Sequence, residues 1–369
     1  MSSSAIPGYE DWPEHARETP AFVAKNATAQ RLADVLGLRA KPAPPPVRRG
    51  TTTVHEGVAI TPLHWQLPYG PPTEAWELRP AQTQGREDDP EPLTGILALH
   101  SHGGRRSTGA AQLIDFAGEN PSAIGNRLAL AGFVVLAHDT FSWASRRFDL
   151  AAPPPKLRRT LDAFLALWEA EGHEPTEDEV FDAVSGEHED LIAKAAGVLG
   201  ETFAGAVVSD DLVAADVLRG LPGVDAGSIA AIGFSGGGGR AHLLGALDDG
   251  IGAVVIAGMM ATFDSLVPDY LETHSWLLHS PGLAQVTDWP DIARVGTPRE
   301  LLVLYGERDP LFPLDGMLAA HHRLSELGAY RGEFFDAGHE FTGPMMDAAT
   351  RFLAAWRDRA VQVDESEKR

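Results

Sequence analysis

The sequence predicts a doubly wound α/β fold with a mostly parallel sheet, and three observations lead to this prediction. First, short apolar segments at residues 95–100, 132–137, 252–257 and 300–305 have the length of buried strands. Second, segments with helical periodicity alternate with them. Third, a short apolar strand ends in a glycine-rich turn around Ser235 and leads directly into a helix. Apolar strands that alternate with helices form a parallel sheet covered on both faces.

The first 50 residues are predicted to form an extension ahead of this sheet. Residues 10–38 have helical apolar spacing, and the proline-rich run 41–46 acts as a stiff connector after them. Residues 51–79 favour strands joined by turns. We therefore expect an N-terminal helical extension with a proline-rich connector, followed by a main domain over residues 51–369.

Residues 141–209 interrupt the alternation of strands and helices. After a break at residues 153–155, apolar residues repeat on one helical face, and Thr176 to Glu179 has the spacing of a capping box that opens another helix. We interpret this region as a helical insertion at the carboxyl edge of the sheet. Because an insertion there shapes a pocket, a lid is favoured over a structural addition.

The alternation resumes after the insertion. A helix is predicted over residues 212–219, and it leads to the strand at residues 228–232 before the turn around Ser235. The last strand is predicted at residues 332–336, and an amphipathic helix over residues 345–356 closes the chain.

Composition excludes several classes of protein and site. No apolar run approaches the about 20 residues of a membrane helix, and the N-terminus lacks the order of a secretory signal. The chain has no cysteine, which excludes disulfides, thiolate catalysis and cysteine zinc sites. The net charge of -22 opposes binding to nucleic acid and to anionic membranes. We expect a cytoplasmic protein with neither partner, and the sequence leaves its oligomeric state open, a homo-oligomer included.

The segment Gly233-Phe234-Ser235-Gly236-Gly237 has the pattern of a nucleophile elbow. Its glycines remove the side-chain clashes that a strained turn would otherwise cause. The turn places the serine hydroxyl at the carboxyl end of the sheet, close to the positive end of the next helix. A nucleotide site is rejected, because the glycine run lacks a following Gly-Lys-Ser/Thr. The pattern therefore predicts Ser235 as a nucleophile.

A serine hydroxyl needs a base to take its proton and a group that holds this base. Asp309 follows the strand at residues 300–305 and is the predicted acid, with Glu307 and Asp315 as the alternatives. His339 follows the last strand and is the predicted base. The order serine, aspartate, histidine along the chain is the order of this type of triad.

Two backbone N–H groups are predicted to bind the developing oxyanion. One belongs to Gly236, directly after the nucleophile, and the other to His102 in the loop after the strand at residues 95–100, with Gly103 as the runner-up. His100 and His102 also allow a metal site, but no following acid and third histidine complete one. We therefore predict no metal.

Side chains of the loops beside the predicted site are candidate substrate contacts. Arg105, Arg106, Arg146 and Arg147 lie in or near these loops, where an arginine can bind a substrate carboxylate bidentately. The alternative is that they pair with the many acidic residues of the chain. Trp143 lines the pocket or anchors the insertion. Arg105, Arg146 and Trp143 are kept as the substrate-binding candidates.

On these motifs the chain resembles the α/β-hydrolase superfamily, and more narrowly its acetyl xylan esterase and dienelactone hydrolase branch. The matching pieces lie between about residues 93 and 356, and they are His100–Gly104, Asp210–Leu212, Gly223–Asp225, Gly233–Gly237, Leu247–Asp249, Leu301–Phe312 and Gly338–His339. The resemblance implies Ser235 as nucleophile, His339 as base and Asp309 as its partner. The long N-terminal portion and the insertion fit the larger, esterase-like members.

The sequence thus predicts a serine hydrolase that cleaves a small-molecule carboxylic ester through an acyl-enzyme, without a metal or an organic cofactor. A hydrolase of C–C or amide bonds on the same fold is one alternative. A non-catalytic, hydrolase-like binding protein is the other.

Overall fold

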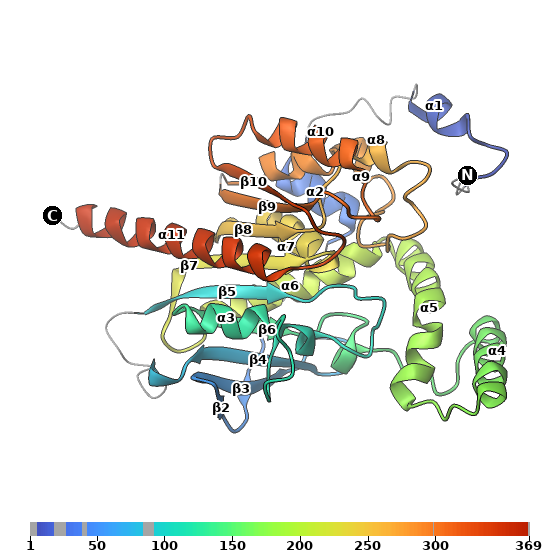
Figure 1. Ribbon diagram of the computed structural model, residues 1–369, viewed down its shortest axis with the longest axis horizontal. Helices are drawn as coiled ribbons and strands as arrows, with labels where there is room; N and C mark the ends of the chain where they lie inside the picture. Colours follow the sequence, from blue (N-terminus) through green and yellow to red (C-terminus); the bar gives the residue numbers. More distant parts are fainter. Residues whose placement is uncertain (1–5, 18–26, 39–42, 84–91, 298, 368–369) are drawn as a thin grey trace.

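The computed structural model describes residues 6–17, 27–38, 43–83, 92–297 and 299–367. Its described residues form a ten-stranded sheet (Figure 1). The strands are β1 (Arg48–Arg49), β2 (Thr53–His55), β3 (Val58–Trp65), β4 (Thr73–Pro80), β5 (Leu93–Leu99), β6 (Val134–His138), β7 (Val224–Phe234), β8 (Ile251–Ala257), β9 (Glu300–Gly306) and β10 (Tyr330–Phe335). Their spatial order is β1-β3-β4-β6-β5-β7-β8-β9-β10, and β2 pairs with β3.

The sheet is antiparallel at its N-terminal edge and parallel from β6 to β10. β4 pairs with β6 in antiparallel register, whereas the six strands β5 to β10 all run parallel to one another. This arrangement confirms the predicted mostly parallel sheet. Because parallel strands end at the same edge, the loops after β5, β7, β8, β9 and β10 meet at one end of the molecule.

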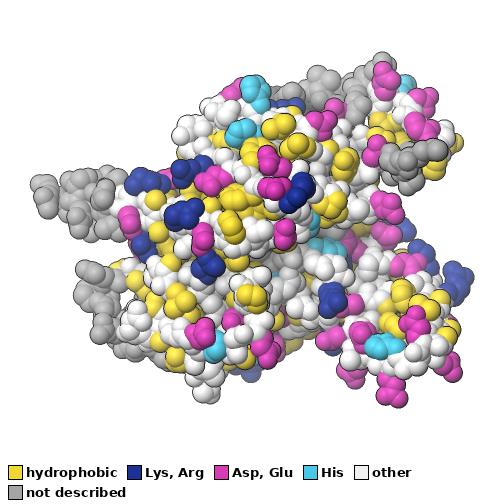
Figure 2. Space-filling model, viewed as in Figure 1, with side chains coloured by type: hydrophobic (Ala, Val, Ile, Leu, Met, Phe, Trp, Pro, Cys, Tyr) yellow, Lys and Arg dark blue, Asp and Glu magenta, His cyan; other side chains and the backbone are white. Residues whose placement is uncertain are grey.

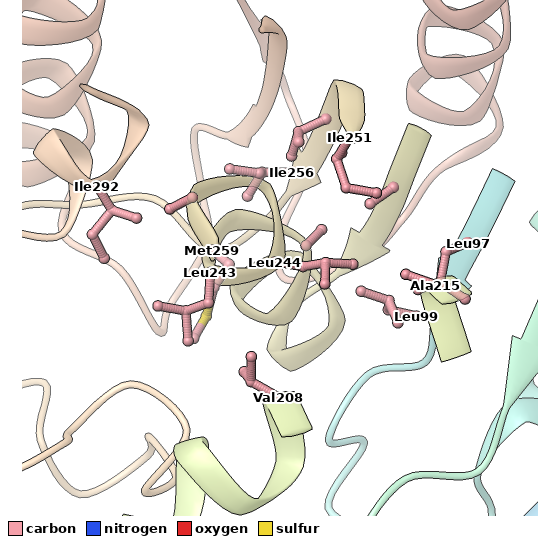
Figure 3. Close-up of a cluster of buried hydrophobic side chains, with 14 of the residues drawn as sticks. Leu97, Leu99, Val208, Ala215, Leu243, Leu244, Ile251, Ile256, Met259 and Ile292 are labelled. Carbon is pink, nitrogen blue, oxygen red and sulfur yellow. The ribbon is translucent and has the colours of Figure 1, made fainter. Parts of the chain in front are cut away.

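Helices cover both faces of the sheet. The longer ones are α2 (Ala29–Leu36), α3 (Ile124–Leu130), α4 (Pro155–Glu171), α5 (Glu177–Leu199), α6 (Phe203–Arg219), α7 (Gly236–Leu247), α10 (Leu314–Leu324) and α11 (Gly343–Glu367), and the short ones are α1 (Trp12–Arg17), α8 (Phe263–Leu266) and α9 (Leu283–Val286). Alternate residues of each strand enter different cores, so Leu97 and Leu99 pack with α6 and α7, whereas Ile96 and Ala98 pack with α3 and α11. Figure 3 shows the core around α7.

The predicted N-terminal helix over residues 10–38 corresponds to α1 and α2, and residues 18–26, with Phe22 and Val23, lie outside the described part of the chain. The Thr28 side chain caps α2 by accepting a hydrogen bond from the Arg31 N–H at 3.2 Å. β1 pairs with β3 and lies before residue 51, so the sheet begins inside the segment predicted as an extension.

The helical insertion consists of α4 and α5, which lie at one end of the sheet and contact each other through Leu157, Leu161 and Val184 (Figure 1). The predicted capping box is present, because the Thr176 and Glu179 side chains each accept a hydrogen bond from the other residue's N–H. α6 starts at residue 203, earlier than predicted, and so continues directly from the insertion.

Within the described ranges, no single helix is long and apolar enough to cross a bilayer, although α5 and α6 pass this test as a pair bent by 85°. Acidic side chains are prominent on the face of the insertion drawn in Figure 2.

Candidate active site

The turn between β7 and α7 holds Ser235 in a strained conformation. Its φ of 53° and ψ of -127° lie in a region that non-glycine residues rarely adopt. A Cβ atom on Gly233 would lie 2.1 Å from the carbonyl carbon of Gly237, and one on Gly237 would lie 2.1 Å from the Leu99 carbonyl oxygen. These two glycines therefore allow the backbone to cross closely enough to present the hydroxyl, as the elbow pattern predicts.

A chain of two hydrogen bonds joins three residues that lie far apart in the sequence. The Nε2 atom of His339 lies 2.8 Å from Ser235 Oγ, and its Nδ1 atom lies 2.7 Å from Asp309 Oδ2. The Asp309 side chain is 1% exposed, and its Oδ1 accepts a hydrogen bond from the Leu311 N–H at 2.9 Å. The His339 ring packs against Phe234 with ring centroids 4.9 Å apart.

These contacts determine the protonation of the imidazole. An ionised carboxylate can only accept, so the proton of neutral His339 lies on Nδ1 and is donated to Asp309. The lone pair on Nε2 then faces the Ser235 hydroxyl, which is the geometry a general base requires. The alternative acids lie elsewhere: Glu307 is exposed, and Asp315 accepts from the Gly316 N–H at the start of α10.

The two predicted oxyanion donors lie side by side next to Ser235. A Cβ atom on Gly236 would lie 3.0 Å from the His102 backbone nitrogen, so the two backbones are in close approach. Gly103 and Gly104 follow with φ values of 66° and 65°, which is a left-handed turn that favours glycine. His102, Gly103 and Gly236 all line one cavity together with Ser235 and His339.

This cavity has a volume of about 680 Å³. Its walls come from the loops after β5, β7, β8, β9 and β10 and from α5 of the insertion. They are formed by Ser101, His102, Gly103, Gly104, Gly186, Glu189, Asp190, Phe234, Ser235, Gly236, Met259, Glu272, Thr273, His274, Ser275, Trp276, Leu311 and His339. Among these described lining residues there is no lysine or arginine, whereas three are acidic.

Two histidines in this wall are neutral at pH 7. Burial, reinforced by the positive charge of Arg106, lowers the pKa of His102 to about 3. Burial also lowers the pKa of His274 to about 4, against the opposing effect of its hydrogen bond to the Leu311 carbonyl. The positive charge of the cavity wall at neutral pH is correspondingly small.

The structure places the predicted substrate-binding side chains outside the cavity lining. Arg146 is buried, where it donates to Asp210 at 3.2 Å and to the Tyr69 carbonyl at 3.0 Å. Trp143 is also buried and donates its indole N–H to the His102 carbonyl at 3.3 Å, so it supports the loop of residues 100–107, which we call the oxyanion loop after the donor predicted in it. Arg105 is exposed but does not line the cavity. None of these three side chains is among the described residues that line the cavity, so the geometry gives no support to their assignment as substrate contacts.

The other two candidate arginines are engaged in ion pairs. Arg106 is buried against Glu189 of α5, and Arg147 donates to Asp178 at 2.6 Å. Both contacts join the loops of the main domain to the insertion. The acidic partners that the sequence offered as the alternative are thus the ones these arginines use.

Sequence reasoning missed Glu189, Asp190, Glu272, His274 and Trp276 as cavity residues. They belong to α5 and to the loop after β8, which carry no motif of their own. Only the prediction that the insertion lies at the carboxyl edge pointed to one of these two segments.

Metal binding finds no support at His100 and His102. The His100 ring is buried with Nδ1 at 2.9 Å from the Ser101 carbonyl oxygen, and burial lowers its pKa well below the ordinary value. In the part of the chain that the structure describes, no group of three or more histidine, aspartate and glutamate side chains is placed to hold a metal ion.

The known proteins to which the chain is similar are named as hydrolases and esterases. No family model matches the chain. It is 26% identical over 292 residues to "Putative hydrolase YtaP" of Bacillus subtilis (strain 168), across 76% of this chain and 83% of that protein. An acetyl xylan esterase from Paenibacillus sp. R4 is similar in structure with a TM-score of 0.57 and 18% identity, over 91% of this chain and 98% of the other.

Acetyl xylan esterase 1 from Thermoanaerobacterium sp. JW/SL YS485 is similar with a TM-score of 0.54 and 15% identity, over 93% of this chain and 98% of the other. These similarities, together with the sheet order and the turn at Ser235, show that the chain has the α/β-hydrolase fold that its sequence resembles.

Proposed function

We propose that the protein is a serine hydrolase that cleaves a small-molecule carboxylic ester. The observation that carries this proposal is the hydrogen-bonded series from Ser235 Oγ through His339 to Asp309, which opens into a cavity lined by two backbone amides. Hydrolase and esterase are also the names of the proteins to which the chain is similar.

The first half of the reaction forms an acyl-enzyme. Ser235 Oγ attacks the ester carbonyl carbon while His339 Nε2 takes its proton. The carbonyl oxygen becomes an oxyanion, and the N–H groups of Gly236 and His102 donate to it. Asp309 stabilises the imidazolium that forms. The C–O bond then breaks, and His339 gives its proton to the departing alcohol.

The second half releases the acid. Water enters in place of the alcohol, and His339 removes a proton from it as it attacks the acyl carbon. The tetrahedral intermediate uses the same two amides and collapses as the bond from the acyl carbon to Ser235 Oγ breaks. His339 returns its proton to Ser235 Oγ, which leaves the carboxylic acid and the free enzyme. This proposal requires no cofactor.

The cavity favours an uncharged ester. Its volume of about 680 Å³ lies in the range of small-molecule sites. Glu272 and Asp190 lie in its described lining, and no lysine or arginine does, so a substrate carboxylate would meet negative charge without an ion-pair partner. We infer that neutral esters bind in preference to anionic ones.

The first experiment is covalent labelling. A fluorophosphonate should attach to Ser235 in the intact protein, as mapped by mass spectrometry of peptides, and the Ser235→Ala variant should remain unlabelled. Absence of labelling in the folded parent protein would favour a non-catalytic binding protein.

The second experiment separates reaction classes. Nitrophenyl esters of increasing acyl length, the matching anilides and a set of diketones are offered to the purified protein. We expect turnover of short esters that is lost in Ser235→Ala. Cleavage of a diketone or an anilide with inert esters would contradict the proposed reaction.

A further inference from the structure

Glu189 of α5 contacts both the loop that carries His102 and residue 276, which also lines the cavity. The Glu189 carboxylate is buried, and its Oε2 lies 3.0 Å from His102 Nε2. Its Oε1 accepts a hydrogen bond from the Trp276 backbone N–H at 2.7 Å. The same carboxylate forms an ion pair with Arg106. Two segments that are distant in sequence, residues 102–106 and residue 276, therefore meet on one side chain of the insertion.

The contact with His102 has a defined direction. The Gly104 N–H donates to His102 Nδ1 at 3.3 Å, so Nδ1 is the unprotonated nitrogen of the ring. The low pKa of His102, about 3, keeps the ring neutral, and its single proton then lies on Nε2 and points at Glu189. On the other side, Trp143 donates to the His102 carbonyl and packs edge-on against the His102 ring. His102 is thus held at both its side chain and its backbone.

A second acid of α5 holds the same loop two helical turns earlier. Asp182 Oδ1 accepts from the backbone N–H groups of Arg106 and Ser107, at 2.8 Å and 3.0 Å. Residues seven apart on a helix lie on the same face, so Asp182 and Glu189 contact the loop along one side of α5. α5 therefore binds the loop at two points, through Asp182 and through Glu189.

Charge makes Glu189 necessary to this arrangement. The Arg106 side chain is 1% exposed and stacks over the Trp143 ring at 4.6 Å. Burial lowers the pKa of Arg106 to about 9, against the opposing effect of the charge on Asp182, so the guanidinium remains charged at pH 7. Without the Glu189 carboxylate this charge would be buried beside the oxyanion loop without its closest counter-ion.

We propose that Glu189 is a positioning residue that sets the His102 amide at the oxyanion site, and that α5 serves as a fixed brace of this site. The proposal rests on the proposed ester hydrolysis. The Glu189 carboxylate bonds to His102, Arg106 and Trp276 rather than to Ser235 or His339, so the residue acts through His102. The same side chain also holds the backbone of Trp276, another residue that lines the cavity.

The test is the Glu189→Gln variant of the full chain, compared with Glu187→Gln. Glu187 lies on the same helix and pairs with Lys156 of α4, outside the cavity lining. Glutamine keeps the size of the side chain but loses the charge and one acceptor. We expect kcat for a nitrophenyl ester to fall roughly 10- to 100-fold, somewhat less than the loss of a whole donor, with KM within about threefold.

A transition-state mimic separates positioning from a merely structural role. A trifluoromethyl ketone that adds to Ser235 places an oxyanion at the two amides, whereas the product alcohol does not. In Glu189→Gln the inhibition constant of the ketone should rise by the same factor as kcat/KM falls, and that of the alcohol should not change. Loss of packing alone would lower the melting temperature without this matched effect. Glu187→Gln should leave all three constants as in the parent.

The His102→Ala variant covers the case that Glu189→Gln does not fold. This variant keeps the backbone amide of residue 102 and the ion pair of Glu189 with Arg106, but it removes the hydrogen bond between the His102 ring and Glu189. The values of kcat and of the affinity for the ketone should therefore fall as in Glu189→Gln. The double variant should be no worse than the more impaired single one. The proposal is overturned if the folded Glu189→Gln or His102→Ala protein keeps both constants within twofold of the parent. If the parent itself hydrolyses no ester, the proposed function fails first and the inference falls with it.

Discussion

Replacement of Asp309 by asparagine tests the hydrogen-bonded series at its buried end. In the structure one oxygen of Asp309 accepts from the Leu311 N–H and the other from His339 Nδ1. In the Asp309→Asn variant the amide oxygen must remain with the Leu311 N–H, because an amide NH₂ there would face another donor. The NH₂ group is therefore turned toward His339, where it can only donate.

The His339 imidazole then adopts the opposite neutral tautomer. His339 Nδ1 becomes an acceptor, its proton moves to Nε2, and the lone pair that faces Ser235 disappears. A wrong tautomer of the triad histidine costs about 10⁴-fold in kcat, which corresponds to about 5.5 kcal/mol of transition-state stabilisation. Because asparagine has the size of aspartate, the fold should be retained.

The assay is kcat for a short nitrophenyl ester at pH 8, with the melting temperature measured on the same samples. Glu307→Gln and Asp315→Asn serve as matched controls, since these acids were the alternatives by sequence and do not contact His339, and they should stay within threefold of the parent. A folded Asp309→Asn enzyme that keeps more than a tenth of kcat would refute the role of Asp309, and so would a large loss in either control.

Two further predictions concern stability and are measured by urea unfolding. Gly237→Ala should destabilise the protein by about 3 kcal/mol and abolish activity, because its Cβ would lie 2.1 Å from the Leu99 carbonyl oxygen. Gly197→Ala, which adds a methyl group in open space on α5, should stabilise the protein by about 0.5–1 kcal/mol. Equal effects of the two substitutions on the free energy of unfolding would contradict this reasoning. Burial lowers the pKa of His242 from 6.5 to about 4, so between these two pH values only the unfolded state binds the proton. The free energy of unfolding should therefore decrease as pH falls from 6.5 to 4, by on the order of 3 kcal/mol for this residue. A His242→Gln variant with the same pH dependence as the parent would show that this histidine does not carry the effect.

Local sequence was sufficient for the parts of the fold that local chemistry determines. The apolar segments predicted at residues 252–257 and 300–305 became β8 and β9 almost to the residue, because a strand buried on both faces needs an unbroken apolar run. Ser235, Asp309 and His339 could be chosen for a related reason. Ser235 and Asp309 follow the buried strands β7 and β9, and His339 follows β10, the partly buried parallel strand at the edge of the sheet. Parallel strands place their carboxyl ends at one edge, which brings the three residues together.

Arg146 shows why the substrate contacts could not be predicted in the same way. An arginine in the segment that follows a strand can point into the cavity or away from it, and the sequence around Arg146 is compatible with both. Its partner Asp210 lies 64 residues further along the chain, and the pairing that buries both side chains exists only once α6 packs beside β6. Glu189 and His102, 87 residues apart, present the same difficulty.

The residues at the strand ends and those that form the remaining cavity walls come from different parts of the fold, and this has a consequence for specificity. The residues that we propose as nucleophile, base, acid and oxyanion donors all come from short turns at strand ends, where the sheet leaves little freedom. The remaining walls come mostly from α5, inserted between β6 and α6, and from the long segment between β8 and β9 that holds Glu272 and Trp276. Glu189 joins these two segments directly through its bond to the Trp276 N–H. Substitutions that change which ester is accepted should therefore map to α5 and residues 272–276, whereas substitutions that change the rate for every ester should map to the strand ends and to Glu189.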